Sequence, residues 1–376
     1  MQFNDLAAQY AVLKDEIEAG IADVISGGRY ILGPQVAELE KRLAEDTGRP
    51  YCVTCANGTD ALVLVLKLWG IGPGDAVFVP DFTYFASAAC VTRVGATMIP
   101  VDIDPRTFNM NPDALEKMIQ RVLEEGQATP KAIIPVDLFG QPADYPRIEA
   151  IAKKYQLRIL EDAAQGYGGA IGARRACAFG DASATSFFPA KPLGCYGDGG
   201  AVFVDTPEEV AVLRSLRANG SSPADKYDNV RIGMNSRLDT LQAAILLPKL
   251  AILRRGELDA RNAAAARYTA LLKDCVQTPV VKEGFFSSWA QYSILFKDSE
   301  ERAKVRAALT EAGIPSMLYY PRGIHAQTAY GDRHFADEDY PATNDAASRI
   351  LSLPMHPYLT EENIGRIAEV ICRAVG

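Results

Sequence analysis

Apolar residues near the N-terminus recur every three or four positions. They are Leu13, Ile17, Ile21, Val24 and Ile25. This spacing places them on one face of a helix. The glycines at 27–28 supply an end to it, because glycine readily adopts the left-handed conformation that closes helices. We therefore predict an amphipathic N-terminal helix.

From residue 50 onward, short apolar runs rich in β-branched residues alternate with helical stretches. The strand-like runs are YCVTC, AVFVP, MIPVDI, AIIPVDLF, RILEDAA, SATSFF and GAVFV. Helical stretches begin near Thr59 and cover FASAACVTRVG and YPRIEAIAKKY. Such alternation is typical of βαβ units, whose parallel strands lie in a sheet covered by helices. The predicted fold class is α/β, with a large, mostly parallel sheet and helices on both faces.

After Gly233 the pattern changes to long helical segments, followed by a second and smaller α/β unit. That unit contains SWAQYSILF as a strand, EERAKVRAALTEAG as a helix, PSMLYY as a strand and a final helix with Thr360 as its N-cap. A chain of 376 residues is long for a single core. We predict a large domain at residues 1–245 and a small C-terminal domain at residues 246–376.

Composition and charge exclude several classes of protein. Hydrophobic residues make up 48% and charged residues 23%, as in ordinary folded proteins. The net charge of −8 leaves no excess of cations to neutralise a nucleic acid, so no such partner is expected. No apolar stretch reaches the ~18 residues of a membrane span, and the first residues, MQFNDLAAQY, do not resemble a signal peptide. We expect a cytoplasmic protein without membrane contact.

The seven cysteines are an odd number scattered from Cys52 to Cys372, which favours reduced thiols over a disulfide framework. Cys52 and Cys55 form a CxxC pair in an apolar run. We predict two buried thiols there rather than a metal or redox site. With only three histidines in the chain, a metal site is not expected.

Candidate chemistry lies where strands end, because ligands of parallel sheets bind at the carboxyl ends of the strands. In CANGTDAL, a helix begins at Gly58, Thr59 and Asp60. Its free N–H groups suit a phosphate, although Asn57 or Thr59 could serve only to cap the helix. In RILEDAAQ, Asp162 follows an apolar run, where a shielded carboxylate needs a cationic partner or hydrogen bonds from loop amides.

The stretch SFFPAKPLGCYGDGG places Ser186 before a turn that carries Lys191. A lysine beside Phe187 and Phe188 would have a lowered amine pKa, which Schiff-base chemistry requires; a solvated surface lysine is the alternative. Tyr84, after the run AVFVP, offers either a flat ring for stacking or an ordinary core residue. A phosphate cradle, an amine, a carboxylate and an aromatic ring together match the groups of pyridoxal 5′-phosphate (PLP).

Five motifs resemble those of the DegT/StrS-type nucleotide-sugar aminotransferases. They are CANGTDAL, PDFTYFASA, EDAAQ, SFFPAKPLGCYGDGGAVF and MNSRLDTLQAAIL, and the resemblance extends from Tyr30 to Leu353. It implies the aspartate aminotransferase fold, PLP fold type I, with PLP as cofactor. A dehydrogenase is disfavoured because no GxGxxG follows the first strand. A non-enzymatic α/β protein stays open as an alternative.

The resemblance also implies contacts to the cofactor and to a second subunit. The implied PLP contacts are Lys191 (Schiff base), Asp162 (pyridine nitrogen), Gln165 (3′-oxygen), Tyr84 (ring face), and Ser186 with Gly58, Thr59 and Asp60 (phosphate). Asn235 would reach the phosphate from the partner subunit. A homodimer with shared active sites is therefore expected.

The reaction implied by the resemblance transfers an amino group from glutamate, which leaves as 2-oxoglutarate, to a UDP- or dTDP-linked keto-sugar. Family members with His at the lysine position dehydrate sugars instead, so Lys191 disfavours a PLP-dependent dehydratase. SFFPAKPLGCYGDGG and NSRLDTLQAAILLPKL look most like enzymes that aminate a UDP-linked 3-oxo-N-acetylglucosaminuronate (UDP-2-acetamido-2-deoxy-3-oxo-glucuronate) in O-antigen assembly. A different keto-deoxysugar, aminated at C3 or C4, is the alternative.

Side chains that bind the sugar nucleotide are expected among Arg237, His325, Tyr319, Tyr320 and Tyr30. Arg237 could instead form a salt bridge at the start of a helix. Tyr319 stands where we would expect His in that subgroup, and Arg322 occupies a usually apolar turn. Both departures bear on which sugar is bound.

Overall fold

The central feature of the fold is a seven-stranded sheet. The computed structural model describes residues 1–222, 224–225, 227–333 and 335–376. The strand order is β1 (Tyr51–Cys55), β9 (Gly200–Val204), β8 (Ala182–Ser186), β5 (Arg158–Asp162), β4 (Thr129–Ile133), β2 (Asp75–Pro80) and β3 (Thr97–Val101). β9 is antiparallel to both neighbours, and the other neighbouring pairs are parallel. The predicted mostly parallel α/β sheet is confirmed.

Helices cover both faces of this sheet, because successive side chains of a strand point to opposite faces. In β2, Val77 and Val79 belong to one buried cluster, whereas Ala76 and Phe78 belong to another. The first face is covered by α3 (Gly58–Leu68), α4 (Ala86–Arg93) and α7 (Pro207–Leu216). The second is covered by α2 (Pro34–Thr47), α5 (Pro112–Glu125), α6 (Tyr145–Tyr155) and α8 (Thr240–Ile252).

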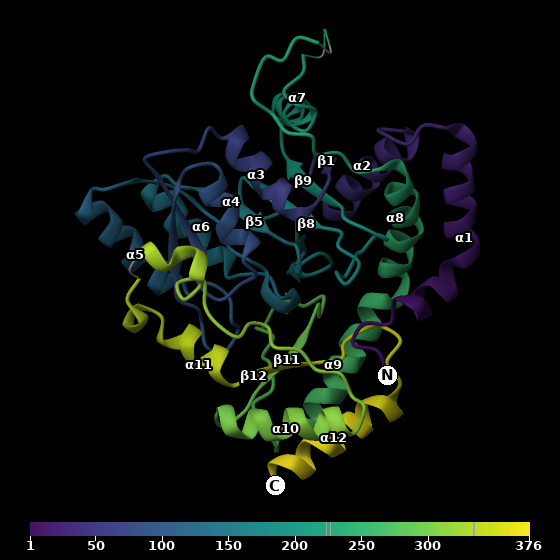
Figure 1. The fold of residues 1–376 in the computed structure, drawn as a ribbon, viewed down its shortest axis with the longest axis vertical. Helices are drawn as coiled ribbons and strands as arrows, with labels where there is room; N and C mark the ends of the chain where they lie inside the picture. The colour runs from purple at the N-terminus through teal and green to yellow at the C-terminus, as the bar shows by residue number, and fades with distance from the viewer. Residues whose placement is uncertain (223, 226, 334) are drawn as a thin grey trace.

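The predicted N-terminal helix is α1 (Leu6–Gly27), which ends at the left-handed residue Gly28, with φ of 66°. It runs beside α8 at the side of the molecule (Figure 1). Leu13 and Ile17 of its apolar face are buried against Ile245 of α8. The expected amphipathic helix is therefore confirmed.

A smaller unit with its own apolar core lies below the sheet in Figure 1. It contains α9 (Leu258–Leu272), β11 (Tyr292–Leu295), α10 (Ser299–Glu311), α11 (Pro341–Arg349), β12 (Ile350–Leu353) and α12 (Glu361–Val375). Thr360 caps α12 as predicted, accepting a hydrogen bond from the amide of Asn363. A short sheet of β6 (Ala170–Ile171), β7 (Arg174–Arg175) and β10 (Phe285–Phe286) completes the fold.

The two units are joined where α8 passes through one π turn, Leu253–Glu257, into α9. The boundary predicted at residues 245–246 lies inside α8, and the division into two domains stays a prediction. The strand expected over PSMLYY is wrong. β12 pairs with β11, so this segment contributes one isolated bridge, between Met317 and Ser352.

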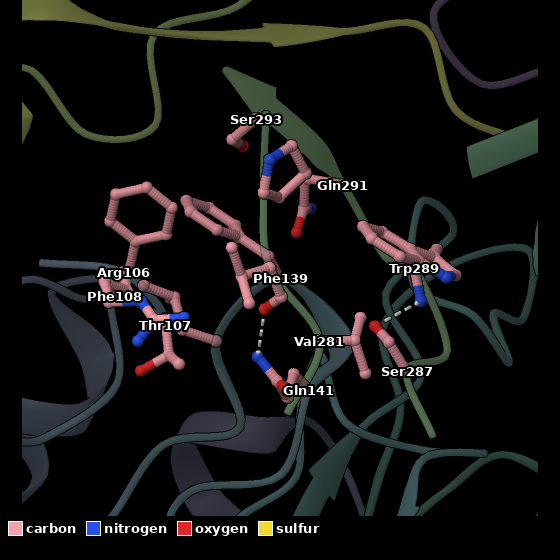
Figure 2. A pocket seen from close by; sticks show the side chains of 13 residues that line it. Arg106, Thr107, Phe108, Phe139, Gln141, Val281, Ser287, Trp289, Gln291 and Ser293 are labelled. Carbon is pink, nitrogen blue, oxygen red and sulfur yellow. Dashed lines mark hydrogen bonds between the residues drawn. The ribbon is translucent and has the colours of Figure 1, made fainter. Parts of the chain in front are cut away.

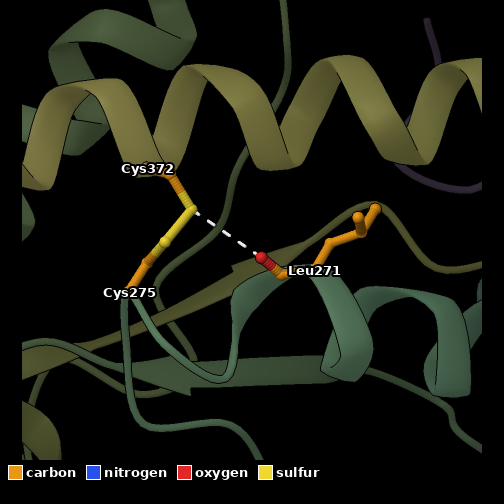
Figure 3. The surroundings of a disulfide bond; sticks show 3 residues. All are labelled: Leu271, Cys275 and Cys372. Carbon is orange, nitrogen blue, oxygen red and sulfur yellow. Dashed lines mark hydrogen bonds between the residues drawn. A yellow bond between two sulfur atoms is a disulfide. The ribbon is translucent and has the colours of Figure 1, made fainter.

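A disulfide joins Cys275, just after α9, to Cys372 in α12 (Figure 3). The expectation of seven reduced thiols is therefore wrong. The two cysteines are 97 residues apart in sequence, and only the fold brings their Cα atoms to 5.5 Å. Cys52 and Cys55 are free and buried, as predicted, and burial raises the pKa of the Cys55 thiol to about 12. Within the described ranges, no helix is long and apolar enough to cross a membrane.

Candidate active site

The expected cofactor residues meet at one edge of the central sheet. Asp162 and Ser186 end the neighbouring parallel strands β5 and β8, so both lie at the carboxyl edge of the sheet. Gly200, which begins β9, pairs with Ser186 on one side and with Cys55 of β1 on the other. The start of α3, which follows β1, is thereby brought beside Ser186.

The start of α3 and Ser186 form a cradle with close backbone packing. A Cβ at Gly58 would lie 2.7 Å from the Cβ of Ser186, and one at Gly200 would lie 2.5 Å from the carbonyl oxygen of Asn57. These distances are too short for any side chain, so both positions require glycine.

Asn57 caps α3, because its side chain accepts a hydrogen bond of 2.8 Å from the amide of Asp60. No hydrogen bond among the described residues uses the amides of Gly58 and Thr59. Two free amides at a helix N-terminus beside the hydroxyl of Ser186 fit a phosphate. Asn57 can therefore cap the helix while the amides of Gly58 and Thr59 bind a phosphate.

Asp162 is a buried carboxylate, with 4% of its surface exposed. Its Oδ2 accepts a hydrogen bond of 2.7 Å from the hydroxyl of Ser87, and its Oδ1 accepts one of 3.1 Å from the amide of Ala164. Burial raises the pKa of Asp162, while these bonds and the charge of Lys191 oppose the rise. Hydrogen bonds thus satisfy this carboxylate, and the charge of Lys191, from the turn after β8, also stabilises it without a direct ion pair among the described residues.

Lys191 is partly buried on a tight turn, where its amide donates to the carbonyl of Phe188 at 2.9 Å. Burial lowers the pKa of the Lys191 amine, and the charge of Asp162 opposes that effect. A lowered pKa increases the fraction of neutral, nucleophilic amine. Of the neighbouring aromatic residues, Phe187 is buried and Phe188 is 51% exposed.

Gln165, Tyr320 and Tyr84 form a connected group beside Asp162. The side-chain amide of Gln165 donates to the hydroxyl of Tyr320 at 3.1 Å and accepts from the amide of Phe139 at 2.8 Å. The ring of Tyr320 lies 6.4 Å from that of Tyr84. Tyr84 is 59% exposed, so it is not a core tyrosine, and its ring is available for stacking.

The other candidates lie around this group with different surroundings. Tyr30 is 48% exposed and its hydroxyl lies 3.4 Å from the carbonyl of Ile25. Asn235 is exposed, and the next residue, Ser236, accepts a hydrogen bond of 3.1 Å from the amide of Ala56 beside the cradle. Arg237 is partly buried and forms no ion pair within the described part of the chain. The alternative role of Arg237, a salt bridge at the start of a helix, is therefore not observed there, and its contact to the sugar nucleotide stays a prediction.

Tyr319 and His325 are held by other side chains. The ring of Tyr319 packs on that of Phe3 at 6.2 Å. His325 is buried, with its Nδ1 2.6 Å from Oδ2 of Asp81 and its ring stacked on Tyr340 at 4.5 Å. Burial lowers the pKa of His325, but Asp81 outweighs it and the net change is upward. A contact from His325 to the sugar stays a prediction.

Three supporting residues were missed by reasoning from the sequence. They are Ser87, which bonds Asp162, Asp81, which bonds His325, and Lys249, whose amine donates to the carbonyl of Gly194 at 2.7 Å. Ser87 had a weak signal, because it lies within one helical turn of Tyr84 in the quoted motif PDFTYFASA. Asp81 lies in the same motif and Lys249 in the run NSRLDTLQAAILLPKL, but nothing in the sequence indicated their partners, which are distant along the chain.

A small cavity of about 20 Å³ lies beside Phe139. Figure 2 shows the aromatic rings of Phe108, Phe139 and Trp289 around it. None of the expected cofactor residues lines it. Another small cavity, of about 10 Å³, includes Lys191 and Arg261 in its lining.

Comparisons with known proteins match the whole chain. Residues 12–372 match the DegT/DnrJ/EryC1/StrS aminotransferase family. UDP-2-acetamido-2-deoxy-3-oxo-D-glucuronate aminotransferase of Pseudomonas aeruginosa is 45% identical, covering 100% of this chain and 99% of that protein. UDP-N-acetyl-3-dehydro-alpha-D-glucosamine 3-aminotransferase of Acidithiobacillus ferrooxidans is 42% identical, over 99% and 97%.

Solved structures agree with these matches. The crystal structure of a DegT DnrJ EryC1 StrS aminotransferase from Brucella abortus has a TM-score of 0.96 and 51% identity, covering 100% of both chains. The PLP-form of a sugar aminotransferase from Streptococcus pneumoniae has a TM-score of 0.89 and 27% identity, covering 96% of both. The expected PLP fold type I is confirmed.

Proposed function

Because this chain belongs to the DegT/DnrJ/EryC1/StrS aminotransferase family, whose members use PLP to aminate nucleotide sugars, we propose that its substrate is UDP-2-acetamido-2-deoxy-3-oxo-glucuronate. Its amino donor is glutamate, which leaves as 2-oxoglutarate. The substrate assignment is supported by 45% identity over the full length to the Pseudomonas aeruginosa enzyme that the name describes. The expected family and cofactor are confirmed.

The observation that carries the chemistry is that Asp162 and the turn carrying Lys191 follow neighbouring strands at the edge where α3 begins, close enough for their charges to interact. When bound there, PLP supplies an electron sink for charge at the substrate carbon. The amine of Lys191, with its lowered pKa, would carry a proton from the substrate carbon of glutamate to C4′ of the cofactor in the first half of the reaction. In the second half it would carry a proton from C4′ to the carbon of the sugar that receives the amino group.

The remaining residues bind and orient. Asp162 balances a positive charge on the ring nitrogen, and Gln165 contacts the 3′-oxygen. Ser186 and the amides of Gly58 and Thr59 hold the phosphate, as their free donors suggest. Asp60, whose amide bonds Asn57, closes this turn. Tyr84, exposed at the same edge, covers one face of the ring.

The test of the substrate compares two nucleotide sugars that differ in one group. The relative from Acidithiobacillus ferrooxidans is named for a 3-dehydro-glucosamine, which carries no carboxylate. We expect amino transfer from glutamate to UDP-2-acetamido-2-deoxy-3-oxo-glucuronate to exceed transfer to the 3-dehydro-glucosamine analogue. Equal or reversed kcat/KM values would contradict the uronate assignment and favour a different keto-sugar.

We also propose that two subunits share their active sites, with Asn235 reaching the phosphate in the partner's site, as the family resemblance implies. Asn235 is exposed and is therefore accessible to a second subunit. The test mixes Lys191→Ala and Asn235→Ala proteins, each inactive alone. In a mixed dimer, one of the two sites combines an intact Lys191 with an intact Asn235, so activity returns. Absence of activity in dimers shown to be mixed would contradict the shared site.

A further inference from the structure

We propose that Ser87 is a positioning residue that holds the carboxylate of Asp162, and that the turn carrying Tyr84 is anchored through it. This inference rests on the proposed roles of Asp162 and Tyr84. Ser87 lies in the first turn of α4 with 2% of its surface exposed, and its hydroxyl is 2.7 Å from Oδ2 of Asp162. Ser87 and Asp162 are far apart in the sequence.

Of the two hydrogen bonds that Asp162 accepts, the one from Ser87 depends on a particular side chain. Oδ1 accepts from the main-chain amide of Ala164, which any residue there except proline would supply. Oδ2 accepts from Ser87, which is the sole side-chain donor to this carboxylate among the described residues. A carboxylate has about four acceptor positions, so two bonds leave room for an N–H of the ring.

Thr83 also belongs to this arrangement, as the direction of the hydrogen bonds shows. A serine hydroxyl has one proton, and Ser87 uses it toward Asp162. The hydroxyl of Thr83 lies 3.3 Å from that of Ser87, so Thr83 is the donor in that contact. Thr83 is 3% exposed, which keeps water from replacing it. A chain of bonds thus runs from Thr83 through Ser87 to Asp162, and each bond polarises the next.

The segment from Asp81 to Ser87 is held at both ends. At its start, the carboxylate of Asp81 accepts a hydrogen bond of 2.7 Å from the amide of His325, and it is fully buried. At its end, Ser87 is bound to Asp162. Tyr84 lies between these anchors with its ring exposed. This short segment therefore positions both the carboxylate of Asp162, which would interact with the ring nitrogen of PLP, and Tyr84, which would cover a face of the ring.

Removing the Ser87 hydroxyl should make Asp162 a stronger proton acceptor, because the buried carboxylate loses one of two donors. The proton shared with the ring nitrogen then moves toward Asp162, and the positive charge on the ring weakens. Other titratable groups that interact with Asp162 are Lys191, Cys90 on α4, Tyr145 on α6 and Tyr320. A Ser87→Ala change leaves all of them in place.

The experiment measures the pH midpoint of the visible absorption of PLP bound at Lys191. A weaker ring charge raises this midpoint, and loss of one bond to a charged group predicts a rise of about one pH unit in Ser87→Ala. Ser87→Thr keeps the hydroxyl and should return the wild-type midpoint. Thr83→Val, which removes only the outer hydroxyl, should shift it in the same direction by less, and it tests the proposal independently of how well Ser87→Ala folds.

Ser183→Ala is the matched control. Ser183 is fully buried and donates to Oε2 of Glu161 at 2.5 Å, one residue before Asp162 on the same strand. This change should lower thermal stability without moving the midpoint.

An unchanged midpoint in Ser87→Ala and Thr83→Val, or an equal shift in Ser183→Ala, would overturn the inference alone. Wild-type protein without a visible band that borohydride removes would overturn the proposed function, and the inference with it.

Discussion

The free energy of unfolding of Asp137→Asn, taken relative to that of the wild type, should be higher at neutral pH than at acid pH. Asp137 is fully buried, and its Oδ1 accepts from the amide of Ala143 at 3.0 Å and from the hydroxyl of Tyr145 at 2.9 Å. Its Oδ2 has no donor among the described residues. Burial, and next the charge of Glu161, raise the pKa of Asp137 well above its usual range.

Glu161 is the neighbouring carboxylate; burial raises its pKa as well, and the hydrogen bonds that it accepts oppose this rise. It accepts from the amides of Cys177 and Phe179 and from the hydroxyl of Ser183, at 2.7, 2.9 and 2.5 Å. Asp137 accepts fewer hydrogen bonds than Glu161 and its pKa is raised well above the usual range, so it is the group of this pair that holds a proton. An asparagine keeps the acceptor at Oδ1 and supplies a permanent N–H donor in place of that proton.

The magnitude follows from proton linkage. Since the folded pKa lies above the unfolded value of about 3.9, the stability from this proton is complete below pH 3.9 and declines as pH rises toward the folded pKa. The decline is about 1.4 kcal/mol for each pH unit between the unfolded and the folded pKa. Asparagine binds no proton, so the stability of Asp137→Asn relative to wild type should rise by that amount.

Urea unfolding of both proteins at several pH values measures this difference. Asp274→Asn, at an exposed aspartate, is the matched control and should follow the wild type at every pH. A difference between Asp137→Asn and wild type that stays constant with pH would refute the reasoning, because it would mean that Asp137 is ionised in the fold.

Three further changes test the site and the disulfide. Lys191→Ala should bind PLP without covalent attachment, through the phosphate contacts, and lose turnover; ordinary activity would eliminate the proposed proton transfer. Arg237→Ala should raise KM for the sugar nucleotide more than for glutamate, and equal effects would contradict a contact to the diphosphate or uronate. Cys372→Ser removes a link between residues 97 apart and should cost up to about 4.7 kcal/mol of unfolding free energy. Reducing agent should lower the urea midpoint of wild type but leave the variant unchanged.

The sheet and the cofactor edge could be predicted because their signals are local. Runs of β-branched residues mark strands, and the polar residue after each run marks the edge where Asp162 and Ser186 lie. Supporting contacts escaped because their partners are far apart in sequence. Ser87 bonds Asp162, 75 residues away, and Asp81 bonds His325, 244 residues away.

The disulfide and the PSMLYY segment were misjudged for a related reason. An odd count of cysteines argued for thiols, yet it says nothing about which two the small unit brings together. The apolar run 317–320 looked like a strand, but Tyr319 and Tyr320 pack their rings against Phe3 and Phe82 instead. Tertiary packing outweighed local β propensity there.

The pairing of Ser186 with Gly200 has a consequence for protein engineering. Because β9 returns antiparallel to β8, the loop from 187 to 199 joins two neighbouring strand ends directly, with no crossover helix to absorb a change in length. An inserted residue before Lys191 would displace its amine relative to Asp162 and Ser186, whose positions are fixed by the sheet. Libraries that vary this loop should therefore keep its length and change side chains alone.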